Sequence, residues 1–525
     1  MNEEPRPQRQ SPSPGSQLGI GALLSYATMA TNLLIALAFT PVVLRLLGPS
    51  EYGLYSLALS LMTYLAMLPA VFASGYLRVF ARLRAASDDD GIARLNGAVM
   101  TVFAGAAALT AVAGSLLAGL ADVVLGDQFT AGEIDRARVL FAVLTCSVVV
   151  SLLLAVFDLY LTARERFAFQ RGLQLLRAVL NPILALPLLL LGWGAVAMVS
   201  AGVVLAAGAG IVTAGYCRRR LAMRLTFRGR PTGIGREILA FSSFIMLNVL
   251  ADQVNWNADR FIVGWFHGAD AVAVYSLAGL LNTYYLGLAS AVSAVFAPRV
   301  NAIVASARST VNVELSDLFI RVGRLQFAVL GVAAVFLVVL GDRFLELWAG
   351  PTYRDSYGIA LLLILPVTIP LIQNVGIEIQ RAKNMHRFRS WVYFGIALVN
   401  IAASIPLTRS FGGVGAAAAT AATLLVGNGL VMNWYYRARV GLDLGRFWSA
   451  IARMLPALAP AVLVGLAVRL TIDVTGVAAF VGASLGLLVV AAASMWLLGL
   501  DKGERAIVRS TIRPLGRALI ARRGA

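Results

Sequence analysis

Charged residues are scarce in this sequence: they make up 13% of its 525 residues, whereas hydrophobic residues make up 59%. Soluble domains carry about 25% charged and about 45–50% apolar residues, so the composition excludes a soluble protein of this length. Uncharged apolar runs of roughly 18 residues or more follow one another along almost the whole chain, and each can cross a hydrocarbon core about 30 Å thick. The sequence therefore predicts an all-α membrane protein.

Residues that usually mark an enzyme are also rare. The sequence has two cysteines, and both Cys146 and Cys217 lie in or at the edge of apolar runs, so no disulfide framework is expected. It contains no Cys/His metal cluster, no glycine-rich phosphate-binding loop and no nucleophile elbow. We therefore expect neither an enzyme nor an ATP-driven pump, and no cofactor.

The apolar runs predict about fourteen transmembrane helices. The regular runs cover residues 18–44, 52–77, 95–121, 139–157, 271–298, 356–377, 390–408, 410–436 and 474–500. A run at 178–217 is long enough for two helices and breaks at the turn signal Gly192-Trp193-Gly194. The less regular segments 236–265, 325–341 and 452–471 complete the count.

The net charge of +18 follows a topological pattern. When the N-terminus is placed in the cytoplasm, most Arg and Lys residues fall on the predicted inside segments and few on the outside loops. Positive charge collects on the cytoplasmic loops of membrane proteins, so this pattern predicts that both termini are cytoplasmic. Membrane topology thus accounts for the basic charge, and no nucleic-acid partner is expected.

The two halves of the chain repeat each other. The motif Tyr-Ser-Leu-Ala at 55–58 recurs at 275–278, and Gly-Trp-Gly-Ala at 192–195 aligns with Gly-Val-Gly-Ala at 413–416, at nearly the same offset. Each half holds an even number of predicted helices, so both halves enter the membrane from the same side and the repeat is parallel.

This repeat divides the chain into six predicted segments. They are a disordered cytoplasmic tail (1–17), an N-terminal six-helix lobe (18–217), a basic cytoplasmic linker (218–235), a C-terminal six-helix lobe (236–436), an extra helix pair (452–499) and a basic cytoplasmic tail (501–525).

Three short motifs carry a family resemblance. The sequence Leu-Leu-Gly-Pro-Ser-Glu-Tyr-Gly-Leu-Tyr-Ser at 46–56, with segments 259–264 and 412–417 in the second half, resembles the polysaccharide-transport (oligosaccharide flippase) family. That family belongs to the superfamily of multidrug, oligosaccharidyl-lipid and polysaccharide exporters. The resemblance implies two six-helix lobes around a central cavity. It further implies alternating access that flips a polyprenyl-pyrophosphate-linked oligosaccharide, such as an O-antigen or exopolysaccharide repeat unit, across the bacterial inner membrane.

Polar residues in two predicted helices indicate a site for a coupling cation. Asn248, Asp252, Asn255 and Asp259 form one stripe of the helix at 236–265, and Asn374 and Glu378, four residues apart, share a face at the end of the predicted helix that begins at residue 356. Ionisable groups at membrane depth usually face protein or water, and such oxygen ligands suit Na⁺ or a transported proton. We therefore hypothesise that Asp252 or Asp259 forms the site with Asn374 and Glu378. The alternative is that these groups join helices by hydrogen bonds.

A cavity for a lipid-linked sugar should present arginine to the pyrophosphate, because the planar guanidinium bonds two phosphate oxygens together. The candidates are Arg78, Arg177, Arg260 and Arg299, at helix ends or within predicted helices. The alternative is that these side chains extend to the lipid headgroups and anchor their helices.

Two other functions remain open. A multidrug or cation antiporter of the same superfamily typically has twelve helices, so the extra pair at 452–499 favours lipid-linked cargo. A membrane glycosyltransferase or polysaccharide polymerase generally has a substantial outside loop with acidic and Arg residues, whereas the predicted outside loops here are short. The expected partners are the polyprenyl-linked oligosaccharide, membrane lipid and polysaccharide assembly enzymes, and the chain is expected to be a monomer.

Overall fold

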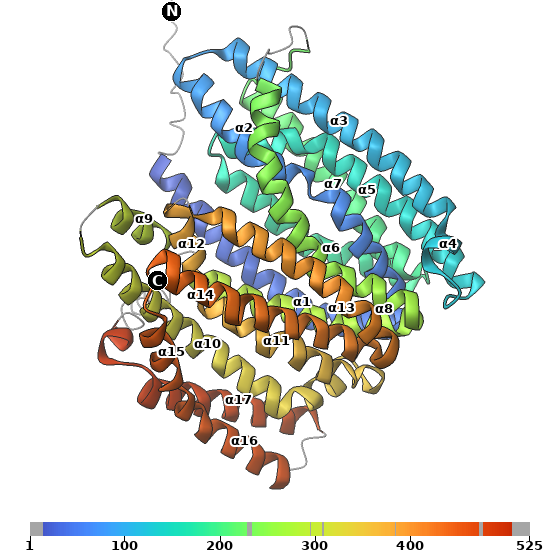
Figure 1. Cartoon of the computed structure of the whole chain (residues 1–525). Helices are drawn as coiled ribbons and strands as arrows, with labels where there is room; N and C mark the ends of the chain where they lie inside the picture. Colours follow the sequence, from blue (N-terminus) through green and yellow to red (C-terminus); the bar gives the residue numbers. More distant parts are fainter. Residues whose placement is uncertain are drawn as a thin grey trace, which may run out of the picture. The chain divides into compact units, whose positions relative to one another are not determined.

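The computed structural model describes residues 14–227, 234–293, 296–306, 309–383, 385–471 and 476–506. Within these ranges the chain is helical and contains no strand (Figure 1). Most of the predicted N-terminal tail (1–17), the middle of the linker (218–235) and most of the C-terminal tail (501–525) lie outside the described residues. The chain divides into two compact units, Met1–Gln253 and Val254–Ala525, which we call unit 1 and unit 2.

Unit 1 is a bundle of long helices. Its elements are α1 (Pro14–Ala66), α2 (Leu68–Ala85), α3 (Asp89–Gly119), α4 (Ala121–Leu125), α5 (Ala131–Ala163), α6 (Phe167–Leu190) and α7 (Gly194–Arg220), followed by the first part of α8 (Ile234–Ser293). Helix α5 packs against α1, α3 and α7, and α6 packs against α1 and α7. Figure 1 shows α3, α5 and α7 side by side.

Unit 2 begins within α8. Its further elements are α9 (Ala297–Ala305), α10 (Val311–Trp348), the 3₁₀ turn Pro351–Tyr353, α11 (Ser356–Ile372), α12 (Val375–Ala382), α13 (His386–Leu424), the π-helical stretch Leu425–Met432, α14 (Asn433–Tyr435), the π-helical stretch Tyr436–Val440, α15 (Leu444–Ala452), the 3₁₀ turn Leu455–Leu458, α16 (Ala459–Thr471), α17 (Val477–Ser494) and the π-helical stretch Met495–Gly499. Helix α10 packs against α11, α15, α16 and α17, and α11 packs against α13.

The described part of the chain has 10 helices long and apolar enough to cross a membrane, or 11 if the bent pair Ser356–Ile372 and Val375–Ala382 counts as one crossing. Three of the ten, at 55, 42 and 54 residues, are at least twice as long as the roughly 20 residues that one crossing needs. Each of the three contains one glycine with non-helical backbone, Gly48, Gly268 or Gly412. The all-α membrane fold class is confirmed, and the count of fourteen stays a prediction.

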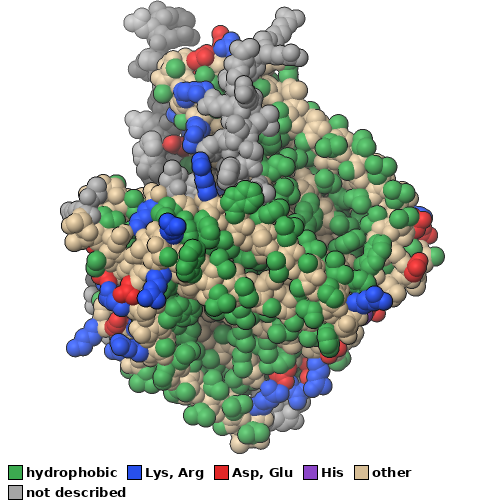
Figure 2. Space-filling model, viewed as in Figure 1, with side chains coloured by type: hydrophobic (Ala, Val, Ile, Leu, Met, Phe, Trp, Pro, Cys, Tyr) green, Lys and Arg blue, Asp and Glu red, His purple; other side chains and the backbone are tan. Residues whose placement is uncertain are grey.

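Large apolar side chains face outward in both units. Leu109 and Leu190 in unit 1 are 68% and 67% exposed, and Leu463 and Leu470 in unit 2 are 66% and 85% exposed. Figure 2 shows apolar side chains over much of the visible face. A soluble protein would bury such residues, whereas lipid tails solvate them, so these faces are suited to the hydrocarbon core of a membrane.

The internal repeat is visible in the backbone. Gly48 (φ 72, ψ 174) and Gly268 (φ 77, ψ −171) have the same conformation at corresponding positions of the two halves. A second pair follows, with Gly126 at φ 77, ψ −173 after α4 and Gly350 at φ 104, ψ 165 after α10. This region of φ/ψ space is accessible almost only to glycine, so the turns of the two halves require the same residue for the same reason.

Replacing Gly48 with alanine is expected to lower the free energy of unfolding by about 1–3 kcal/mol, the usual cost of a forbidden backbone conformation. A Cβ atom at Gly48 would have nothing within 4 Å, so the loss comes from the backbone alone. The control is Gly105→Ala, because Gly105 lies on the exposed side of α3 with equal space and helical backbone. Alanine should be neutral or stabilising there. Equal unfolding midpoints of the two purified variants would contradict this explanation.

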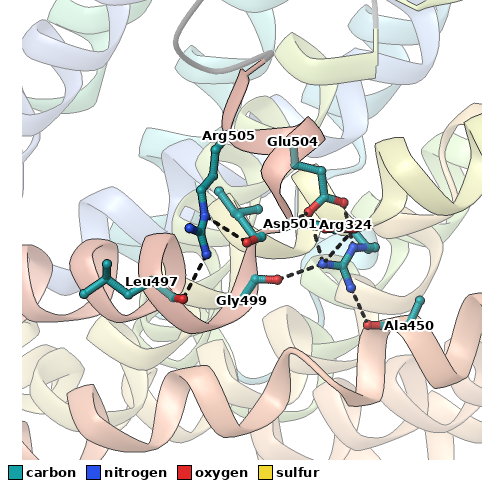
Figure 3. Close-up of polar contacts among 8 residues, drawn as sticks. Arg324, Ala450, Leu497, Gly499, Asp501, Glu504 and Arg505 are labelled. Carbon is teal, nitrogen blue, oxygen red and sulfur yellow. Dashed lines mark hydrogen bonds and ion pairs between the residues drawn. The ribbon is translucent and has the colours of Figure 1, made fainter.

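Two ion pairs hold the C-terminal helices against α10. Near the C-terminal end of α10, Asp342 Oδ2 lies 2.6 Å from Arg469 Nη2 of α16. In the N-terminal half of α10, Arg324 Nε donates to Glu504 Oε1 at 2.6 Å, and Arg324 Nη2 donates to Glu504 Oε2 at 3.0 Å. The same guanidinium donates to the carbonyls of Ala450 (3.0 Å) and Gly499 (2.8 Å), as Figure 3 shows.

The distance between the two ion pairs along α10 is close to the thickness of a membrane. Arg324 and Asp342 are about five turns apart on α10 and therefore share a face, about 27 Å apart along the helix axis at 1.5 Å per residue. This separation is close to the ~30 Å thickness of a hydrocarbon core. Between them an apolar cluster joins α10, α16 and α17 through Val339, Ala461 and Leu487. The helix pair is thus an integral part of unit 2.

Candidate functional site

A polar cavity in unit 1 contains one of the four candidate arginines. The cavity has a volume of about 370 Å³ and lies where α6 packs between α1 and α7. Arg177 of α6 lines it together with Thr28 and Asn32 of α1 and with Gln174 and Asn181 of α6. The helix positions them because Gln174, Arg177 and Asn181 follow at spacings of three and four residues and so share one face.

The lining of this cavity is suited to a polar or anionic group. One guanidinium and three side-chain amides contribute to it, and none of the described residues lining it is acidic. Asn181 Oδ1 is buried and has no hydrogen-bond partner within the part of the chain that the structure describes. A smaller cavity of about 120 Å³ shares Gln174 and Arg177 and adds Asp158 of α5. Arg177 therefore lies where the two cavities meet.

The other candidate arginines are placed differently. Arg78 on α2 and Arg299 on α9 are exposed, as Arg177 also is, but neither lines the two cavities that contain Arg177. Arg260 is half-buried on α8, and its Nη1 donates to Asn257 Oδ1 at 3.2 Å, whereas its Nε is buried and has no hydrogen-bond partner in the described ranges. Of the four, Arg177 lines the cavities of unit 1.

The most buried carboxylate of the candidate set is Asp259, which is 2% exposed in unit 2. Its Oδ2 accepts hydrogen bonds from Tyr275 Oη at 2.8 Å and from Thr420 Oγ1 at 2.6 Å, and its Oδ1 accepts one from Ser404 Oγ at 2.8 Å. Asn400 Oδ1 lies 3.3 Å from both of those hydroxyls of Ser404 and Thr420. We call these five residues the Asp259 cluster.

The breaks in α8 and α13 bring this cluster together. Asp259 and Tyr275 lie on α8 on either side of Gly268, and Ser404 and Thr420 lie on α13 on either side of Gly412. The cluster offers carboxylate, amide and hydroxyl oxygens in an apolar interior. Such a set suits a hard cation such as Na⁺, or a proton on the carboxylate. The described residues contain no group of three or more His, Cys, Asp or Glu that could hold a metal ion.

The residues that surround Asp259 in the structure differ from those that the sequence predicted. Glu378 on α12 forms an ion pair with Arg381 at 2.8 Å, and Asn374 begins that helix. Neither is among the hydrogen-bond partners of Asp259 in the part of the chain described. Asp252 is exposed on α8, and the side chain of Asn248 lies outside the described residues.

Sequence reasoning missed four members of the cluster, namely Tyr275, Asn400, Ser404 and Thr420. A signal was present, because Asn400 and Ser404 are polar, four residues apart and inside an otherwise apolar run. Tyr275 and Thr420 carry no comparable signal, since single Tyr and Thr residues are common in membrane helices.

A family model described as "Polysaccharide biosynthesis protein" matches residues 42–358, which is more than half of the chain. The chain belongs to this family. No curated protein matches it. Among solved structures, the lipid II flippase MurJ in an inward closed conformation has 15% identity and a TM-score of 0.71, and the match covers 91% of this chain and 98% of that one.

Two MATE transporters are also similar in structure. An inward-facing MATE transporter of the MOP superfamily has 15% identity and a TM-score of 0.60, covering 79% of this chain and 97% of its own. A mutant of the Vibrio cholerae MATE transporter VcmN has 16% identity and a TM-score of 0.54, covering 83% and 99%. The family member thus has the fold shared by MurJ and the MATE transporters, and the resemblance found in the sequence is confirmed.

Proposed function

We propose that this chain is a flippase that moves a polyprenyl-pyrophosphate-linked oligosaccharide across the bacterial inner membrane by alternating access, with both termini in the cytoplasm. The lining of the unit 1 cavity carries this proposal. The 370 Å³ cavity presents one guanidinium and three amides, and none of its described lining residues is acidic, whereas Asp158 lines the adjoining 120 Å³ cavity; this lining suits the oxygens of a pyrophosphate and the hydroxyls of a sugar. A cavity for a cationic drug would instead present a carboxylate to its ligand.

The extent of the structural similarity supports the same cargo. The match to the structure titled as a lipid II flippase covers 91% of this chain, whereas the two MATE matches cover 79% and 83%. Membership of a polysaccharide biosynthesis family agrees with a sugar-bearing substrate. Polysaccharide assembly enzymes are the natural partners of such a flippase.

The Asp259 cluster is proposed to hold the coupling cation, Na⁺ or a proton. A single carboxylate buried at membrane depth is costly unless it binds a cation or a proton in part of the transport cycle. Loading the cluster can favour one state of the transporter only if the cation binds the two states with different affinities. The cluster would change between such states when the helix segments on either side of Gly268 or Gly412 move.

In this mechanism the unit 1 cavity receives the headgroup from the cytoplasm. Arg177 binds the pyrophosphate, the amides of Gln174 and Asn181 bond to the first sugar, and the polyprenyl chain stays in lipid. Asn181 Oδ1, which no described residue bonds to, would accept a hydrogen bond from a sugar hydroxyl. Release outside follows when the cation-loaded state opens the cavity to the other side.

The deciding experiment is translocation in proteoliposomes. A fluorescent undecaprenyl-pyrophosphate oligosaccharide is compared with a small cationic dye, each with and without a Na⁺ or proton gradient. Movement of the lipid-linked sugar but not of the dye is expected. Movement of the dye alone would make the chain a cation antiporter and overturn the proposal.

Arg177→Ala is expected to lower transport of the lipid-linked sugar at subsaturating concentration by about 10- to 100-fold, because a charge-assisted hydrogen bond contributes about 1.5–3 kcal/mol. Arg177→Lys should restore part of the rate, since the ammonium keeps the charge but not the planar fork. The control is Arg219→Ala at the exposed end of α7. Equal rates for Arg177→Ala and Arg219→Ala would remove Arg177 from the proposed site.

A further inference from the structure

The segment 46–56, which carries the first of the family motifs, joins three helices at one end of unit 1 through its polar side chains. Ser50 Oγ donates to Glu133 Oε1 at 2.5 Å. Glu51 Oε1 lies 3.0 Å from Arg136 Nη1, and Glu51 Oε2 accepts a hydrogen bond from the backbone N–H of Ala195 at 3.1 Å. The carboxylate of Glu51 therefore joins the turn within α1 to the first turns of α5 and α7. This end of the unit is the one that the charge pattern predicts to face outside.

The corresponding end of unit 2 lacks this carboxylate. The repeat that aligns Gly48 with Gly268 places Ala271 where unit 1 has Glu51. A cavity of about 660 Å³ lies there, lined among others by Ala271, by Tyr357 in the first turn of α11 and by Gly413 after the break in α13. The helices of unit 2 that correspond to those joined by Glu51 in unit 1 thus enclose a cavity. The volume is in the range of small-molecule sites, about 300–1,000 Å³.

The lining of this cavity combines an aromatic ring with balanced charge. Phe411 is 67% exposed, and Arg354 and Asp355 are exposed beside it in the lining. Asp342 also lines the cavity, and its Oδ2 is paired with Arg469 while its Oδ1 is buried and has no hydrogen-bond partner among the described residues. The carboxylates of Asp342 and Asp355 are balanced by the guanidinium groups of Arg354 and Arg469, so the cavity does not favour an ion of either sign.

A neutral sugar ring fits this chemistry. The ring has an apolar C–H face that packs on an aromatic side chain, and its hydroxyls donate to carboxylates and accept from a guanidinium. We infer that the cavity binds a sugar residue of the transported oligosaccharide at the outer end of unit 2, with the ring on Phe411 and its hydroxyls on Arg354 and Asp355. The inference rests on the proposed function for its source of sugar and on the predicted topology for its side of the membrane.

The test measures sugar binding separately from transport. The probe is the oligosaccharide released by mild acid from the polyprenyl-pyrophosphate carrier of the source cell, so it has neither pyrophosphate nor lipid. Binding to the purified full-length protein in detergent is followed by saturation-transfer NMR. The wild type is expected to bind, and Phe411→Ala is expected to bind about tenfold more weakly because the stacking surface is lost.

Two further variants make the result specific. Ala271→Glu places a carboxylate where unit 1 has Glu51, and it is expected to weaken binding at least as much as Phe411→Ala, because the added side chain occupies part of the cavity. Phe227→Ala is the matched control, because Phe227 is 68% exposed in unit 1 and does not line the cavity.

The possible results separate the inference from the proposed function. No binding to the wild type, or equal binding by Phe411→Ala, Ala271→Glu and Phe227→Ala, would overturn the inference even if the wild type transports the lipid-linked sugar. Sugar binding that depends on Phe411, together with no transport of the lipid-linked sugar in proteoliposomes, would overturn the proposed function and leave the sugar site standing.

Discussion

Glu504→Ala is expected to lower the free energy of unfolding by about 3–5 kcal/mol, because it leaves the buried guanidinium of Arg324 without its counter-charge. The side chains of Glu504 and Arg324 are only 4% and 11% exposed, so water cannot replace the lost carboxylate. The guanidinium would keep only its bonds to the carbonyls of Ala450 and Gly499 and its longer contact of 3.7 Å to the exposed Asp501. The measurement is the midpoint of thermal unfolding of the purified protein.

Two comparisons test the cause of this loss. Glu378→Ala breaks the ion pair with Arg381, whose side chains are 30% and 63% exposed, and it should cost about 0–1 kcal/mol. The double variant Arg324→Met with Glu504→Leu should recover much of the loss, since apolar groups of similar size often replace a buried pair without cost. If Glu504→Ala unfolds at the same temperature as Glu378→Ala, the pair does not hold the C-terminal helices.

Asp259→Asn is expected to abolish the dependence of transport on a Na⁺ or proton gradient, so that the rates with and without the gradient become equal. Asparagine keeps the size of the side chain and one acceptor oxygen but removes the negative charge that binds a cation or proton. The hydroxyls of Ser404 and Thr420 remain, yet neutral oxygens alone compensate poorly for a cation's lost hydration. The measurement is the proteoliposome rate for the lipid-linked sugar.

Asp252 and Glu378, the other carboxylates that the sequence predicted for the cation site, provide the controls. Asp252→Asn changes an exposed carboxylate of the same helix, and Glu378→Gln changes one already paired with Arg381. Both variants should keep the gradient dependence of the wild type. Loss of that dependence in Glu378→Gln, with full dependence in Asp259→Asn, would return the coupling site to the helix pair α11–α12.

The sequence predicted only part of the environment of the polar stripe on α8. Its period correctly indicated a helix that does not face lipid along its whole length, and Asn255 and Asp259 are buried. The helical period places Asp252 and Asp259 on the same face. In the structure, however, Asp252 is exposed and Asp259 is buried. The partners of Asp259 on α13 are more than a hundred residues away along the chain, and nothing local to either segment specifies that they meet.

The sequence by itself determined the membrane class, the parallel repeat and the glycine turns. These features are local, because a lipid core requires each crossing to satisfy its own backbone hydrogen bonds and to be apolar for about 20 residues. Only the tertiary structure decided that Arg177 lines a cavity, that Arg324 is buried against Glu504 and that Asp259 meets Ser404 and Thr420. Those choices depend on how each helix is rotated and packed against its neighbours, which a run of apolar residues leaves open.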